Sequence, residues 1–174
     1  MRNKEVPNEV EIFVWRSNLN CLPTRVELDK GGVDLDSILS PSCQACTESV
    51  EHILVHCTYV SKVWDQVIKW WNLENHRTSN IEEAFVINPN VISSNITKQI
   101  WQAVRWICGY IIWKHRNLEN FSRKVWIILT ILNEIQIQRF FWISKRLKKT
   151  KIDWHQWLIN PNSYVVPQDR FGIG

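Results

Sequence analysis

Several patterns that mark enzymes are missing from this chain of 174 residues. It has only five glycines, no glycine-rich phosphate loop, no nucleophile elbow and no His-Glu-x-x-His zinc protease helix. It also lacks an Asp-Asp pair, which could hold two metal ions for phosphoryl transfer. Glu82-Glu83 is the one adjacent carboxylate pair, and its polar surroundings indicate solvated surface. We therefore expect no enzymatic activity from this chain.

Long hydrophobic runs are missing as well. The most apolar stretch, residues 100–113, is interrupted by Gln102 and Arg105 and is shorter than the ~20 residues that a bilayer requires. The segment Met1–Glu11 is charged and polar, which argues against a secretory signal. We expect no membrane segment and an intracellular location, in the nucleus or the cytoplasm.

The composition is that of a globular protein with a core. Hydrophobic residues make up 45%, charged residues 22%, and the net charge is only +4, so the chain is neither disordered nor strongly cationic. At this length roughly 70% of the surface of the unfolded chain can be buried. The five cysteines are an odd number, and three of them cluster, which fits a metal site in a reducing compartment better than a disulfide framework.

The cluster has the spacing C-x2-C-x5-H-x4-C and comprises Cys43, Cys46, His52 and Cys57. Thiolate and imidazole are the preferred donors of Zn²⁺, and four protein ligands leave no position for substrate, so the predicted zinc is structural. His56 is the alternative fourth ligand, because His52-x3-His56 matches a C2H2 finger. Such a finger needs ~12 residues between its Cys and His pairs, and only five separate Cys46 from His52, which favours Cys57.

Hydrophobic spacing predicts helices along the whole chain. A short helix over residues 10–19 is expected to pack Phe13, Trp15 and Leu19. Thr24 is the expected N-cap of a second short helix, 25–30, which Gly31-Gly32 closes. An amphipathic helix over about 59–71 follows the cysteine cluster directly.

The predicted fold is all-α, with a small zinc-stabilised helical module followed by a Trp-rich helical hairpin. The module covers residues 6–73, and residues 74–96 form a connector with at most a short helical piece. The C-terminal region, 97–160, holds helices over about 97–120 and 123–148 that pair antiparallel, and 161–174 is a tail. Five tryptophans in these helices are expected in the core: Trp101, Trp106, Trp113, Trp126 and Trp142.

Five short motifs occur in order. They are Ile12-Phe13-Val14-Trp15-Arg16, Leu22-Pro23-Thr24-Arg25, Cys43-Gln44-Ala45-Cys46, Glu51-His52-Ile53-Leu54 with Cys57, and Val63-Trp64. Their order and spacing resemble the reverse-transcriptase zinc-binding domain that follows the polymerase domain of plant non-LTR (LINE-type) retrotransposons. The resemblance covers about residues 6–73. The stretch 97–160, with Ile112-Trp113-Lys114-His115-Arg116-Asn117, is similar to the tail that often follows this domain.

The resemblance implies a zinc-dependent accessory domain that binds nucleic acid, and it places the last zinc ligand at Cys57. Because the paired aspartates of a polymerase are missing, it also implies a stand-alone remnant or a domesticated fragment of a retroelement. The alternative is a structural or protein-interaction domain, or a decayed fragment, in which zinc only stabilises the fold. A protein partner would then bind through the Trp-rich helices. The sequence leaves the oligomeric state open.

A basic run is the predicted contact with RNA or DNA, since clustered Lys and Arg neutralise phosphates. The run comprises Lys145, Arg146, Lys148, Lys149 and Lys151. A basic helix end also complements the helix dipole and increases solubility, which is the competing interpretation. Two smaller basic sets could line the same surface, and one sequence does not place them on one face: Arg16 with Arg25, and Lys114 with His115 and Arg116.

Overall fold

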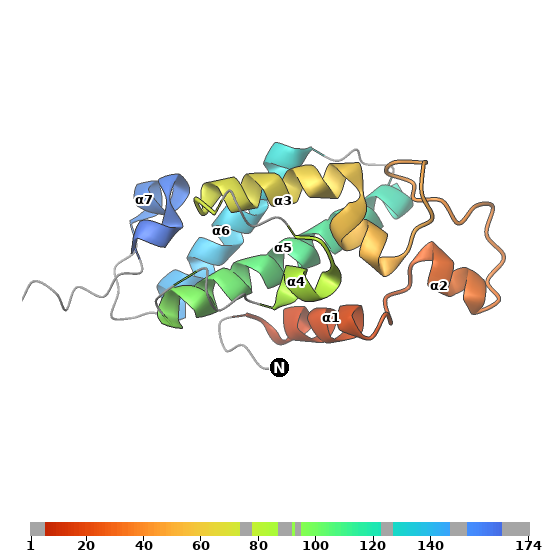
Figure 1. Cartoon of the computed structure of the whole chain (residues 1–174), viewed down its shortest axis with the longest axis horizontal. Helices are drawn as coiled ribbons and strands as arrows, with labels where there is room; N and C mark the ends of the chain where they lie inside the picture. Colours follow the sequence, from red (N-terminus) through yellow and green to blue (C-terminus); the bar gives the residue numbers. More distant parts are fainter. Residues whose placement is uncertain are drawn as a thin grey trace, which may run out of the picture.

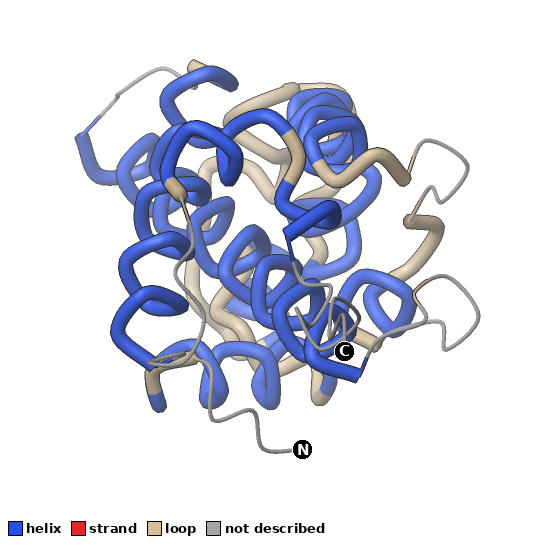
Figure 2. Tube along the Cα trace, turned by 90° about the vertical axis from the view of Figure 1, so that its left-hand side faces the viewer, coloured by secondary structure: helices blue, strands red, loops and turns tan. Residues whose placement is uncertain are grey.

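The structure is a computed structural model, and it describes residues 6–73, 78–86, 92, 95–122, 127–146 and 153–164. These residues form helices and no strand, as Figure 2 shows, so the all-α prediction is confirmed. The elements in chain order are α1 (Asn8–Asn18), α2 (Arg25–Lys30), the π-helical turn η1 (His52–His56), α3 (Thr58–Trp70), α4 (Ile81–Phe85), α5 (Asn95–Ser122), α6 (Ile128–Arg146), α7 (Trp154–Ile159) and the 3₁₀ turn η2 (Pro161–Tyr164).

Helix α5 is the central element of the fold. It contacts α1, α4, α6 and η1, while α3 lies on α6 and η1 (Figure 1). Helices α5 and α6 run in opposite directions, as predicted for a hairpin (Figure 1). Helix α2 and the loop after it lie at one end of the long axis, and α7 lies at the other (Figure 1). No helix among the described residues is long and apolar enough to cross a membrane.

Helix α1 packs a different face from the one predicted. Its buried residues are Val10, Phe13, Val14 and Ser17. Trp15 and Leu19 are 63% and 53% exposed, so the prediction that they pack inward with Phe13 is wrong. Successive helical residues are turned by about 100°, which places Trp15 on the side opposite Phe13. The motif around Trp15 therefore leaves a large aromatic side chain at the surface.

The short helix α2 and the amphipathic helix α3 agree with their predictions. The Thr24 hydroxyl caps α2 by accepting a hydrogen bond from the backbone N–H of Glu27 at 3.4 Å. Gly31 ends the helix, and Gly32 follows with φ +79°, a left-handed conformation that favours glycine. Helix α3 buries six apolar residues at three- and four-residue intervals: Val60, Val63, Trp64, Val67, Ile68 and Trp70.

The predicted connector contains one short helix, α4, whose Ala84 and Phe85 are fully buried. The indole N–H of Trp106 on α5 donates to the Phe85 carbonyl oxygen at 2.9 Å, which fixes α4 to α5. Buried residues of α1, α3, α5 and α6 belong to one hydrophobic cluster. The boundaries at 73/74 and 96/97 stay predictions, and residues 74–77, 87–91 and 93–94 lie outside the described part.

Most described tryptophans pack inside the molecule. Trp101 and Trp106 are buried, as predicted, whereas Trp113 and Trp142 are half-buried and Trp126 lies outside the described residues. Three further tryptophans contact one another where α7 lies near the C-terminal end of α3. The rings of Trp70 and Trp157 meet edge to face with centroids 5.1 Å apart, and those of Trp71 and Trp157 with centroids 6.3 Å apart. These contacts explain why a chain of this length uses so many indoles.

Candidate metal centre

A hairpin-like loop presents the first two cysteines. Its two arms pair through an isolated bridge between Leu39 and Thr47, and the backbone N–H of Ser40 donates to the Cys46 carbonyl oxygen at 2.8 Å. The turn between Cys43 and Cys46 includes Gln44, whose φ of +52° is left-handed. This tight turn carries Cys43 toward the helical segment that follows.

The π-helical turn η1 presents the other two donors. A π-helix bonds residue i+5 to residue i, and here the backbone N–H of Cys57 donates to the His52 carbonyl oxygen at 2.8 Å. Residues five apart are thereby stacked on one side of the turn, which a regular α-helix would not do. Because α3 begins directly after Cys57, the N–H groups of its first turn also face this thiol.

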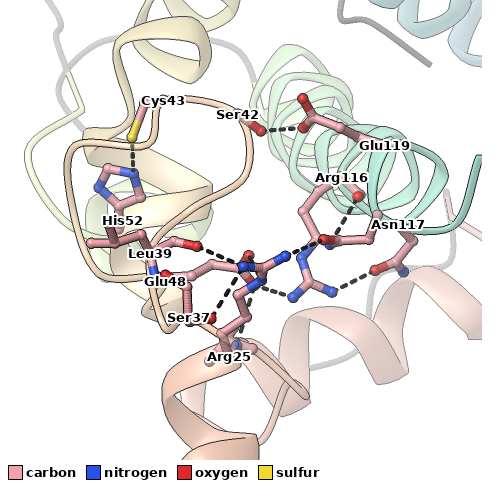
Figure 3. Close-up of polar contacts among 12 residues, drawn as sticks. Arg25, Ser37, Leu39, Ser42, Cys43, Glu48, His52, Arg116, Asn117 and Glu119 are labelled. Atoms are coloured by element: carbon pink, nitrogen blue, oxygen red, sulfur yellow. Dashed lines mark hydrogen bonds and ion pairs between the residues drawn. The ribbon is translucent and has the colours of Figure 1, made fainter. Parts of the chain in front are cut away.

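Three donors converge at this place. The Sγ atoms of Cys43 and Cys57 and a ring nitrogen of His52 all lie within 4.8 Å of one another. The Cys43 Sγ lies 3.3 Å from His52 Nε2 (Figure 3). Donors at about 2.0–2.3 Å from a tetrahedral zinc lie roughly 3.3–3.8 Å apart, so this trio fits one ion with small adjustments. The chemistry of two sulfurs and an imidazole suits zinc better than magnesium or calcium.

Two predicted or alternative ligands lie apart from this group. Cys46 is exposed, and its sulfur does not belong to the set of donors within 4.8 Å of one another. His56 is exposed too, and its Nε2 donates to the Ser79 carbonyl oxygen at 2.9 Å. The structure thus brings Cys57, and not His56, to Cys43 and His52.

The protonation of the donors is set by burial and by local hydrogen bonds. Burial raises the pKa of Cys57 above its usual range. Burial also raises the pKa of Cys43, but hydrogen bonds from the backbone N–H groups of Ala45 and Cys46 outweigh it and the pKa is lowered. Burial, with the nearby charge of His56, lowers the pKa of His52. A neutral imidazole and a thiolate are the forms that bind a metal. The lowered pKa values of His52 and Cys43 favour these forms, whereas the raised pKa of Cys57 favours the neutral thiol.

A buried carboxylate lies beneath the metal centre. Glu48 is 0% exposed and stands in the sequence between the two pairs of predicted ligands. Its Oε1 accepts a hydrogen bond from Arg116 Nη2 of α5, and its Oε2 lies 3.7 Å from Arg25 Nε of α2 (Figure 3). Two guanidinium groups therefore compensate one buried negative charge.

Arg25 and Ser42 also hold the cysteine-bearing loop against the rest of the molecule. Arg25 Nη1 donates to the carbonyl oxygens of Ser37 and Leu39 at 3.1 and 3.2 Å. Nearer the tip, the Ser42 hydroxyl donates to a carboxylate oxygen of Glu119 on α5 (Figure 3). The loop that bears Cys43 is thus tied to α2 and to the C-terminal part of α5.

The side chains of the smaller basic sets make contacts within the molecule. Arg16 folds back onto the Cys21 carbonyl oxygen at 3.0 Å, and Arg25 points inward to Glu48. Arg116 is buried against Trp113, with its guanidinium 4.8 Å from the ring centroid. The other two members, Lys114 and His115, both contact Glu134 on α6, at 3.1 and 3.0 Å.

The basic run is described only at its start. Lys145 is exposed at the end of α6, with its ammonium 4.0 Å from the ring centroid of Phe141. The backbone of Arg146 ends α6, and Lys148, Lys149 and Lys151 lie outside the described residues. The nucleic-acid prediction for this run is therefore untested.

Sequence reasoning missed the partnership of Glu48 and Arg116. The two residues are 68 positions apart, and no local spacing links them. Glu48 stands among polar residues such as Ser49 and Glu51, where a carboxylate is expected at the surface, so nothing in the sequence indicates that it is buried and needs a compensating positive charge. The sequence does not show which cation supplies that charge.

One comparison with known proteins gives a match. Residues 1–64 match the family model zf-RVT, described as zinc-binding in reverse transcriptase. No curated protein and no solved structure matches the chain. All four predicted ligands fall within the matched segment, and the resemblance drawn from the motifs is confirmed by this match of residues 1–64 to the family model zf-RVT.

Proposed function

We propose that this chain is a non-catalytic accessory domain, of retrotransposon origin, in which a structural zinc ion shapes a helical module that binds RNA or DNA. The observation that carries the proposal is the convergence of Cys43, His52 and Cys57 inside the segment that matches the family. A site closed by protein donors holds its ion without offering a position to substrate, which agrees with a scaffolding role.

In this proposal Cys46 supplies the fourth donor. It shares a two-residue turn with Cys43, and its exposed thiol is free to turn toward an ion that the other three donors already hold. Ion binding would then close the loop between residues 40 and 46. Structural zinc contributes on the order of 10 kcal/mol of binding free energy, enough to offset the ordering of such a short loop.

The nucleic-acid contact is proposed at the basic run of the sequence from Lys145 to Lys151, of which Lys145 and Arg146 end α6. Lysine and arginine in series bind phosphates with release of counterions, so affinity falls steeply with salt. The test is fluorescence anisotropy with single-stranded and double-stranded RNA and DNA at several salt concentrations. Charge reversal at Lys145, Arg146, Lys148 and Lys149 should abolish binding and its salt dependence. A matched control reverses Lys62 and Lys69, two exposed lysines on α3.

A protein-interaction role is the second candidate, and one observation favours it. Ile12 and Trp15 on α1 and Leu19 at its C-cap are exposed apolar residues, at 56%, 63% and 53% exposure. Large exposed aromatic residues are enriched at binding hot spots. If no nucleic acid binds, this second role replaces the first. If nucleic acid binds and charge reversal leaves the affinity unchanged, the contact does not lie at the basic run.

A further inference from the structure

The segment that matches the family model depends on a residue outside the match to compensate its buried carboxylate. Glu48 is fully buried between the cysteine turn and η1, and its carboxylate accepts from Arg116, a residue of α5 outside the matched segment. We propose that Arg116 is a positioning residue of the metal centre, which through Glu48 couples zinc binding to the docking of α5. This inference rests on the proposed zinc site.

Glu48 lies in the chain between the two pairs of proposed zinc ligands, and its position affects both pairs. Its backbone N–H donates to the Ile38 carbonyl oxygen at 2.8 Å, which pairs the arms of the loop that bears Cys43. On its C-terminal side, His52 follows four residues later, at the start of η1. A shift of Glu48 would therefore displace Cys43 and His52 relative to each other.

Arg116 is built to hold this carboxylate. Its side chain is buried, its guanidinium lies on the Trp113 ring, and its Nη1 donates to Asn117 Oδ1 at 2.9 Å. These contacts fix the planar group, so that one edge faces Glu48. Arg25 adds a second and more distant charge, at 3.7 Å from the other carboxylate oxygen.

A second tie joins the same two parts of the molecule. The Ser42 hydroxyl, next to Cys43, donates to Glu119, which lies one helical turn after Arg116 on α5. The loop is thus attached to α5 at its base through Glu48 and near its tip through Ser42 (Figure 3). An ion that orders the loop would favour the docked helix, and by reciprocity the docked helix would favour the ion.

The proposal is tested by measuring zinc affinity with a chelator of known strength on the full chain. Arg116→Met should weaken zinc binding by about 10- to 100-fold, the usual effect of losing a residue that supports metal ligands. Arg116→Lys keeps the positive charge but not the planar guanidinium. Its zinc affinity should lie between that of the wild type and that of Arg116→Met. Lys30→Met is the matched control, because it breaks an exposed ion pair with Glu27 in the same module, and it should change the affinity less than twofold.

Hydrogen exchange provides a readout that a general loss of stability would not produce. Zinc should slow amide exchange in residues 113–120 of the wild-type chain, and this zinc-dependent protection should disappear in Arg116→Met. If Arg116→Met does not fold, the double variant Glu48→Gln/Arg116→Met removes the buried carboxylate together with its buried cation, while the partly exposed Arg25 keeps its hydrogen bonds to Ser37 and Leu39. This double variant should fold and should also lack the protection.

Three outcomes overturn the coupling. They are a folded Arg116→Met chain with wild-type zinc affinity, zinc that leaves exchange in α5 unchanged, and zinc-dependent protection of α5 that persists in the double variant. A wild-type chain that binds no zinc at all would overturn the proposed function together with this inference. The two failures are therefore distinguishable by the wild-type result alone.

Discussion

Trp70 on α3 donates its indole N–H to the Trp157 carbonyl oxygen on α7, at 2.9 Å, while the Trp157 indole donates to the Gln136 carbonyl oxygen on α6, at 3.0 Å. The two hydrogen bonds join three helices at the end of the molecule opposite α2. They satisfy both buried indoles, which is the condition for placing tryptophan in a core. The short helix α7 is held by this arrangement.

We predict that Trp157→Ala destabilises the chain by about 3–5 kcal/mol, the usual cost of truncating a buried aromatic residue. Urea unfolding followed by circular dichroism gives the free energy of unfolding. Trp15→Ala is the control, because its side chain is 63% exposed and its loss should change stability by no more than about 0.5 kcal/mol. Equal losses for the two variants would contradict the described packing of α7.

The proposed metal centre predicts which substitutions of Cys43, Cys57 and His56 remove the zinc ion and which retain it. Native mass spectrometry of the chain expressed with ample zinc should find one zinc ion per chain, and Cys43→Ser and Cys57→Ser should lose it. His56→Ala should retain it, because the His56 ring contacts Ser79 away from the converging donors. Removal of zinc by a chelator should lower the melting temperature of the wild-type chain and leave that of Cys57→Ser unchanged.

Cys46→Ser separates two arrangements of the site. If Cys46 turns in to complete the tetrahedron, this variant should bind zinc more weakly than wild type and about as weakly as Cys43→Ser. Full zinc affinity in Cys46→Ser would show that three protein donors suffice and that a water or another group takes the fourth position.

We predict that Gly109→Ala destabilises α5, although alanine is ordinarily better than glycine within a helix by up to ~1 kcal/mol. A Cβ at this position would lie 2.6 Å from Phe85 Cε1. Phe85 is fully buried, so its ring has little room to move away. We expect a cost of about 1–3 kcal/mol in thermal or urea unfolding, the usual cost of overpacking. Phe85→Leu should relieve the clash, so the two substitutions should be less harmful together than their sum.

The ion pairs of Glu134 predict a loss of stability in acid. Burial raises the pKa of this carboxyl, but hydrogen bonds from His115 and Lys114 lower it below its ordinary value of 4.5. Since the folded carboxyl binds a proton less readily than the unfolded one, its stabilisation is complete above pH about 4.5 and is lost as pH falls through the lower folded pKa.

Glu134→Gln should therefore be less stable than wild type at pH 7, and the difference should shrink as the pH falls below about 4. Free energies of unfolding at pH 7, 5, 4 and 3 provide the comparison. A difference in unfolding free energy that stays constant over this range would show that it does not come from the charge of the Glu134 carboxylate.

Local patterns predicted much of this molecule because the interactions involved are local. The Thr24 cap, the glycine end of α2 and the stripe of α3 depend on residues three or four apart, and the structure has them where the spacing placed them. The face of α1 was assigned wrongly because Trp15 is apolar and yet exposed. Apolar identity alone does not determine which side of a short helix is covered.

Part of the candidate site could likewise be predicted from local spacing, and part depends on tertiary packing. Cys43, His52 and Cys57 could be grouped from their spacing, since fifteen residues of chain leave few ways to separate them. The pairing of Glu48 with Arg116 depends on how α5 lies against the module, and that is fixed by the packing of α1, α4 and η1 on the helix. Tertiary packing of this kind leaves no periodic trace in the sequence.

The π-helical turn makes the interval between His52 and Cys57 a fixed length of chain. Inserting one residue within it would place Cys57 six positions after His52 and would remove the hydrogen bond that closes the π turn, so the two donors would point apart although both remained. Deleting one residue would place them four apart, a spacing that brings two side chains to one face only if the turn becomes α-helical. An insertion at this point is therefore expected to be more damaging to the centre than a deletion or than most changes in side chain.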